Sequence, residues 1–280
     1  MIGQTKLLAE IDRLIENNSF PRFSIIVGKR GAGHTDAAKY IASKFSDADY
    51  IQLTDVKIDT VRTMIKQAYS LHRCTVFCAP HADDMSINAK NALLKVVEEV
   101  PNKAYFIMCL EDLSNTLATI QSRAQVFTML DCSSNDIAEY AKSLGVSENE
   151  LDIYRDVCRT PGDVNMLYVY GATNFRKYTE FVVNRVLTMP SGEIFKLTDK
   201  LSFKEDDGKY DVALFLKSMQ SMLLKQISAD TAQKETSVRR QIVMCVGRYL
   251  ADLRIKGINK IMLMDNLLLQ MRKIWKEQNK

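Results

Sequence analysis

Short apolar runs alternate with helical patterns over the first half of the chain. The apolar runs cover residues 23–27, 50–53, 75–79, 105–109 and 125–129. Between them, apolar side chains recur at helical spacing over residues 35–45, 60–71 and 88–99. Strands that alternate with helices predict a parallel sheet with helices on both of its faces. We therefore expect one α/β domain over residues 1–130.

The second half of the chain is predicted to be helical throughout. Serine and threonine caps open three short helical segments, and these segments predict a small helical domain over residues 131–172. From about residue 175 onward, long amphipathic stripes of apolar side chains follow one another at helical spacing. Buried helices in a bundle explain these stripes, so we expect an all-α domain over residues 173–280.

Composition and charge limit the number of domains and the kinds of partner, but they do not identify a function. The chain has 280 residues, 46% of them hydrophobic and 26% charged, which is ordinary for a globular protein of two or three domains. Its net charge of +4 permits contact with nucleic acid without arguing for it, because the charges are not gathered into one basic block. No apolar stretch reaches the length that spans a membrane, so we expect no membrane partner.

The cysteines point to a cellular compartment. Six cysteines are scattered along the chain without a C-x-x-C pair. Such spacing suits isolated thiols in a reducing environment better than a disulfide framework or a zinc site. We therefore expect a cytoplasmic protein.

The first candidate for chemistry is the segment GKRGAGHT, which directly follows the apolar run FSIIV. A phosphate-binding loop has the pattern G-x-x-x-x-G-K-[ST] between a strand and a helix. Gly28, Gly33 and Thr35 occupy their positions in this pattern, and Gly31 adds another glycine, but His34 replaces the lysine. A histidine is mostly uncharged at neutral pH and cannot replace a permanent cation. From these residues alone, a nucleotide loop and a glycine-rich turn without a ligand both remain open.

The acidic motif that an ATP-hydrolysing loop needs is missing. Such enzymes have a strand that ends in Asp, often followed by Glu, to hold Mg²⁺. Here the strand at residues 75–79 continues into Pro80 and His81. Asp83 and Asp84 lie beyond the strand end, where a loop or helix-cap role is favoured over metal ligation. We therefore expect no metal site.

Two further segments carry a resemblance to a known family. Residues 91–101 read NALLKVVEEVP and residues 117–125 read LATIQSRAQ. They resemble the NALLK-x-x-EEP and TI-x-SR-C-Q segments of bacterial clamp-loader subunits, which are AAA+ proteins related to replication factor C. Residues 2–4 match the opening I-G-Q, and residues 160–162 resemble the S-P-G of the lid. The resemblance covers residues 2–167 and implies an AAA+ α/β domain, a helical lid and an all-α collar domain for oligomerisation.

Within that family, the degenerate motifs resemble the delta-prime type, which shares the ATPase fold but often does not hydrolyse ATP. Where active relatives carry a lid arginine in G-D-x-R, this chain has Asn165. Many relatives have four zinc-binding cysteines, but only Cys74 and Cys78 fall in the corresponding interval. The resemblance therefore implies no cofactor and no zinc, and it leaves ATP binding without hydrolysis open at the glycine loop.

The pair Ser122-Arg123 is preserved. In the family, this arginine faces the nucleotide of the neighbouring subunit and stabilises the charge of the transferred phosphoryl group, so we assign Arg123 as an arginine finger in trans. From the residues alone, an ordinary surface arginine is the alternative. Ala124 replaces the cysteine of the family motif and leaves the arginine untouched.

The resemblance implies a function in DNA replication. It suggests a non-hydrolysing delta-prime-type subunit of the DNA polymerase III clamp loader. Its partners would be the ATPase subunits and the delta subunit, the sliding clamp, and primer-template DNA within the assembly. The alternative is an ATP-binding or weakly active AAA+ ATPase that acts in replication or repair outside the loader.

Overall fold

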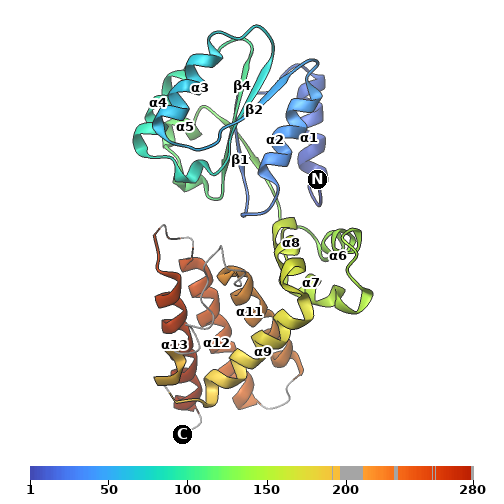
Figure 1. Cartoon of the computed structure of the whole chain (residues 1–280), viewed down its shortest axis with the longest axis vertical. Helices are drawn as coiled ribbons and strands as arrows, with labels where there is room; N and C mark the ends of the chain where they lie inside the picture. Colours follow the sequence, from blue (N-terminus) through green and yellow to red (C-terminus); the bar gives the residue numbers. More distant parts are fainter. Residues whose placement is uncertain (191, 196–210, 230–232, 254, 256, 279–280) are drawn as a thin grey trace. The chain divides into compact units, whose positions relative to one another are not determined.

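A computed structural model describes residues 1–190, 192–195, 211–229, 233–253, 255 and 257–278 (Figure 1). The chain divides into two compact units. The first contains Met1–Asp136 and Thr160–Gly162, and the second contains Ile137–Arg159 and Asp163–Lys280. The division into three domains at residues 130 and 172 stays a prediction.

The first unit is built on a five-stranded parallel sheet. Its strand order is β2-β3-β4-β1-β5, and every neighbouring pair is parallel. The strands are β1 (Phe23–Val27), β2 (Asp49–Gln52), β3 (Thr75–Ala79), β4 (Ala104–Leu110) and β5 (Gln125–Thr128). The interior strand β3 is buried along its whole length, whereas the edge strands β2 and β5 expose several side chains. This sheet, with the helices around it and the helical second unit, confirms the predicted fold class.

Helices cover both faces of the sheet (Figure 1). α1 and α2 lie on one face, and α3, α4 and α5 lie on the other. Successive strand residues alternate between the two apolar clusters, so Phe23 and Ile25 face the α3 and α4 side while Ile26 faces α1 and α2. The helices are α1 (Thr5–Glu16), α2 (His34–Lys44), α3 (Ile58–Ala68), α4 (Ile87–Glu98) and α5 (Ala118–Gln121), with short 3-10 helices η1 (Ala82–Asp84) and η2 (Leu113–Asn115).

The second unit is helical over the residues that the structure describes. Its short helices are α6 (Ser134–Ser143), which starts in the first unit, η3 (Glu148–Glu150), α7 (Leu151–Val157) and α8 (Pro161–Tyr170). Four long helices follow: α9 (Ala172–Thr188), α11 (Val212–Ala229), α12 (Gln233–Asp252) and α13 (Lys260–Gln278). They form a bundle, because α9 packs against α11 and α13, and α12 packs against the same two helices (Figure 1). None of the described helices is long and apolar enough to cross a membrane.

A buried ion pair joins α8 to this bundle. Asp163 is 4% exposed, and its carboxylate lies 2.8 Å from Lys217 Nζ on α11. The same carboxylate accepts a hydrogen bond of 2.8 Å from the backbone N–H of Arg159. A buried carboxylate is tolerated when it is paired in this way, and removing one partner strongly destabilises the protein.

We predict that Lys217→Met lowers the free energy of unfolding by about 3 kcal/mol, because Asp163 stays buried without its lysine partner. Urea denaturation, followed by circular dichroism, measures the loss. Lys225→Met is the matched control on the same helix, since its partner Asp156 is more exposed. We expect that control to lose less than about 1 kcal/mol. Equal losses of unfolding free energy in the two variants would contradict the conclusion that the buried pair of Asp163 and Lys217 stabilises the protein.

Candidate functional site

The glycine loop has the strand–loop–helix form that its sequence predicts. Gly28 follows β1, and α2 begins at His34 with Gly33 as its N-cap. Gly31 and Gly33 have φ angles of +80° and +99°, which glycine adopts without the strain that other residues meet. Backbone N–H groups at such a helix N-terminus are suited to binding an anion. The structure thus brings the predicted loop residues, Thr35 included, into one turn.

Two of the chain's own side chains pack onto the first glycine of this loop. A Cβ atom placed on Gly28 would lie 2.8 Å from Met129 Cβ and 3.3 Å from His34 Nε2. Met129 follows β5, and its backbone N–H donates a 2.7 Å hydrogen bond to Val27 O at the end of β1. No sequence motif points to Met129, because only the pairing of β5 with β1 brings it to the loop.

His34 cannot act as the missing lysine. Burial lowers the pKa of its imidazole below the usual 6.5, so the ring is neutral at pH 7. Its Nε2 atom is buried beside the backbone of Gly28 and makes no well-formed hydrogen bond to any residue that the structure describes. A neutral ring in this position offers no permanent charge to a phosphate.

The segment that resembles the start of the lid packs onto the loop from another side. Gly162 N–H donates a 3.0 Å hydrogen bond to Gly31 O. A Cβ atom on Gly162 would lie only 2.6 Å from Gly31 Cα, and one on Gly31 would lie 3.0 Å from Thr160 Oγ1. The two backbones therefore touch where both residues lack a side chain. Asn165, on the next turn of α8, accepts a 3.0 Å hydrogen bond from Tyr140 Oη.

Asp83 serves as a loop cap. One of its carboxylate oxygens accepts a 2.8 Å hydrogen bond from Glu111 N–H. The other accepts from Asp112 N–H at 3.3 Å and from Asn115 Nδ2 at 2.9 Å. Both oxygens therefore hold the segment that follows β4. Within the described part of the chain, no group of three or more His, Cys, Asp or Glu side chains is placed to hold a metal ion.

Arg123 lies on the surface directly after α5, which Ser122 ends. Its Nη1 donates to Thr119 O at 3.1 Å and to Ser122 Oγ at 3.4 Å. Its Nη2 lies 3.3 Å from Glu98 Oε1 at the end of α4, and the side chain is 43% exposed. The guanidinium is thus held at one place on the surface by an exposed ion pair and the end of α5.

The loop and Arg123 lie at opposite ends of the sheet. β1 and β5 are parallel, with Ser24 opposite Gln125 at their amino ends. Arg123 precedes that amino end, whereas Gly28 follows the carboxyl end of β1. Gly28 lies four positions after Ser24, which is about 13 Å at a rise of about 3.3 Å per residue. An arginine side chain does not cover this distance, so the structure does not bring the two predicted sites together.

Sequence comparisons connect the chain to replication proteins. The family model described as DNA polymerase III, delta subunit, matches residues 45–133. A replication factor C small subunit of Methanothermobacter thermautotrophicus is 26% identical over 160 residues, or 53% of this chain and 50% of that protein. The DNA polymerase III subunit delta' of Haemophilus influenzae is 32% identical over 120 residues, or 40% of this chain and 36% of that subunit. The chain spans about half the length of the replication factor C relatives that it matches first.

A solved structure supports the same fold. A DNA polymerase III gamma subunit-related protein of Thermotoga maritima superposes with a TM-score of 0.51 at 17% identity, covering 96% of this chain and 99% of that one. The parallel sheet with a glycine loop after β1 and a helical second unit is thus a fold that this chain shares with that protein. The family match over residues 45–133 and the delta' and replication factor C relatives support a clamp-loader AAA+ protein. This confirms the resemblance carried by residues 91–101 and 117–125.

We predict that His34 makes the protein sensitive to acid. Because burial lowers its pKa in the folded state, its contribution is complete above the unfolded pKa of 6.5 and is lost as the pH falls through the folded pKa. His34→Asn removes this term, so its unfolding temperature should fall less than that of the wild type between about pH 7.5 and about pH 5. Differential scanning calorimetry at the two pH values measures this difference.

The control for this prediction is His72→Asn, which removes a histidine from an exposed position. It should keep the pH dependence of the wild type. If His34→Asn also keeps the wild-type dependence, the imidazole is not held neutral by burial.

Proposed function

We propose that this chain is a non-hydrolysing, delta-prime-type subunit of a DNA polymerase III clamp loader, and that it supplies Arg123 to ATP bound by a neighbouring ATPase subunit. One observation carries the proposal: Arg123 and the chain's own glycine loop lie at opposite ends of β1 and β5. An arginine so placed serves a nucleotide only if another subunit holds that nucleotide. The likeness to the delta' subunit of Haemophilus influenzae supports the same role.

The glycine loop supports the proposal that this chain does not itself hydrolyse ATP. Phosphoryl transfer needs a permanent cation at the β- and γ-phosphates and an acid that holds Mg²⁺. His34 is neutral, and both oxygens of Asp83 accept hydrogen bonds from the segment after β4. Met129 and Gly162 also pack directly on the loop. Among the described residues, the positions of the lysine and of the acidic pair therefore lack the charges that hydrolysis needs.

Arg123 can leave its present partners with little loss of free energy. Its ion pair with Glu98 is exposed on both sides, and such pairs contribute at most about 1 kcal/mol. In contrast, an arginine supplied in trans to a transferring phosphoryl group raises the rate by roughly 10³–10⁵. The free energy lost when Arg123 leaves Glu98 is thus smaller than the transition-state stabilisation that Arg123 can supply to a neighbour's nucleotide. Ser122, whose hydroxyl accepts from Arg123 at 3.4 Å, helps to direct the guanidinium.

The second unit offers surfaces for partner subunits. Phe181 on α9, Leu224 on α11 and Met244 on α12 are large apolar side chains that are exposed in the single chain. Exposed apolar side chains on a helical bundle suit burial against other subunits, as in a collar. We assign the ATPase subunits and the delta subunit as partners, with the sliding clamp and primer-template DNA reached in the assembly. Phosphate contacts with DNA would depend on charge and not on sequence.

A second candidate is an AAA+ protein that binds ATP and acts outside the loader. It is favoured by the backbone of the loop, since Gly31 and Gly33 keep the positive φ angles of an anion-binding turn. It predicts a protein that acts without the loader subunits. The proposed function instead requires association with them.

We predict that Arg123→Ala leaves assembly intact and lowers ATP hydrolysis. In a loader reconstituted from the full chain and the other subunits of its organism, turnover at the ATP site facing Arg123 should fall by roughly 10³-fold or more. Steady-state ATPase assays with clamp and primed DNA measure the rate, and gel filtration checks assembly. Arg123→Lys should recover only part of the rate, because lysine lacks the forked donor geometry.

Arg62→Ala is the matched control, because Arg62 is an exposed arginine of the same α/β unit on α3. It should keep the full ATPase rate. Full ATPase activity of the assembled Arg123→Ala loader would show that Arg123 is not an arginine finger, while the chain would still be a subunit of the loader. Failure of the wild-type chain to join the loader at micromolar concentrations would instead favour the second candidate.

A further inference from the structure

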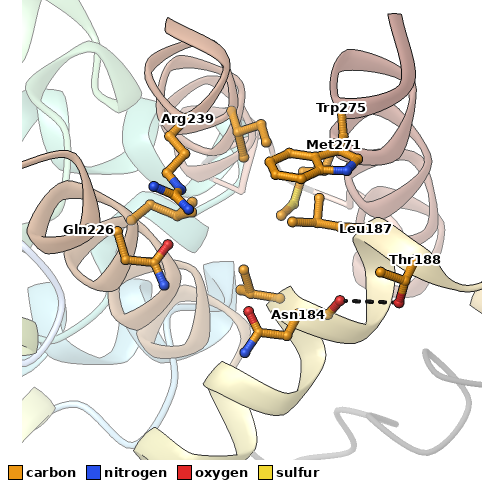
Figure 2. Close-up of a pocket in the computed structure, with 10 residues that line it drawn as sticks. Asn184, Leu187, Thr188, Gln226, Arg239, Met271 and Trp275 are labelled. Atoms are coloured by element: carbon orange, nitrogen blue, oxygen red, sulfur yellow. Dashed lines mark hydrogen bonds between the residues drawn. The ribbon is translucent and has the colours of Figure 1, made fainter. Parts of the chain in front are cut away.

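A cavity of about 290 Å³ lies between the four long helices of the second unit (Figure 2). All four helices of the bundle contribute side chains to it. It lies within the second unit and contains none of the residues assigned to the glycine loop or to the arginine finger. Spaces between the helices of a bundle are a common place for small-molecule sites.

Most of the cavity wall is apolar. In Figure 2 the indole of Trp275 lies beside Met271 and Leu187, across the cavity from Arg239. The apolar lining residues are Val183, Leu187, Leu223, Ile242, Met271 and Trp275. An engineered apolar cavity of about 150 Å³ binds benzene, so about 290 Å³ has room for an apolar group of roughly ten heavy atoms.

The polar side chains that line the cavity are fewer than the apolar ones and include one cation. Arg239 on α12 and Gln226 on α11 lie on the same side in Figure 2, with Asn184 of α9 below them. Among the described residues that line the cavity, none is acidic. A guanidinium has five N–H donors in a fork that matches a carboxylate, so Arg239 can bind one in addition to its other contacts. The carboxamides of Gln226 and Asn184 can donate further hydrogen bonds.

From this arrangement we propose that the four-helix cavity is a binding site for a small amphipathic carboxylate. The apolar part of the ligand lies against Trp275 and Met271, and its carboxylate is bound by Arg239. An apolar wall with a few convergent polar groups fixes a ligand's orientation in this way. The guanidinium of Arg239 and the carboxamides of Gln226 and Asn184 together offer several N–H donors, which suit the two oxygens of a carboxylate. The site is independent of the proposed clamp-loader role.

The chain contains one tryptophan, and it lines this cavity, so its fluorescence reports on the site without background from other positions. Octanoate, with an eight-carbon chain, is a suitable probe. We expect a saturable change in Trp275 emission when the full chain is titrated with octanoate, with a Kd on the order of 1 mM. Neutral 1-octanol should bind at least about tenfold more weakly, because it lacks the charge-assisted hydrogen bonds.

Two arginine variants make the test specific. Arg239→Met keeps a long side chain but removes the cation, so octanoate should bind about tenfold more weakly while 1-octanol is unaffected. Arg240→Met is the matched control, because Arg240 is the next residue on α12, is exposed, and does not line the cavity. It should bind octanoate like the wild type, and calorimetric unfolding checks that both variants fold. The proposal is overturned if the wild type shows no saturable change, or if the two variants weaken octanoate binding equally.

Discussion

The parallel pairing of β1 with β5 determines which chemistry this chain can take part in. Because the strands run in the same direction, the carboxyl end of β1 leads into the glycine loop while the amino end of β5 receives Arg123 from α5. The length of these two paired strands thus separates the glycine loop from the preserved arginine. A phosphate at the loop is out of reach of Arg123, so under the proposed function Arg123 acts on a nucleotide that another subunit holds.

A second constraint acts at the loop itself. Gly31 and Gly162 meet backbone to backbone, and His34 and Met129 pack on Gly28. Burial also keeps the imidazole neutral. These contacts pack the loop firmly into the α/β unit.

Sequence patterns predicted the fold closely and the site only in part. The strand at residues 75–79 and the start of α2 near residue 35 agree with the structure, because local apolar periodicity and glycine chemistry determine them. The contacts of Met129 with Gly28 and of Gly162 with Gly31 join residues more than a hundred positions apart. No local sequence motif predicts contacts over such a separation. The pair of Glu98 with Arg123 depends on α4 packing against α5. Such contacts follow from tertiary structure and leave no periodic trace.

Calorimetric titration of the whole chain with ATP and Mg²⁺ tests most directly whether this loop is closed to nucleotide. The chain that we describe should give only the heat of dilution, with no saturable binding up to millimolar ATP. Its thermal unfolding temperature should also stay the same with and without ATP, because a ligand stabilises a folded protein only if it binds it. Stoichiometric, saturable binding at micromolar ATP, with a matching rise in unfolding temperature, would contradict the account.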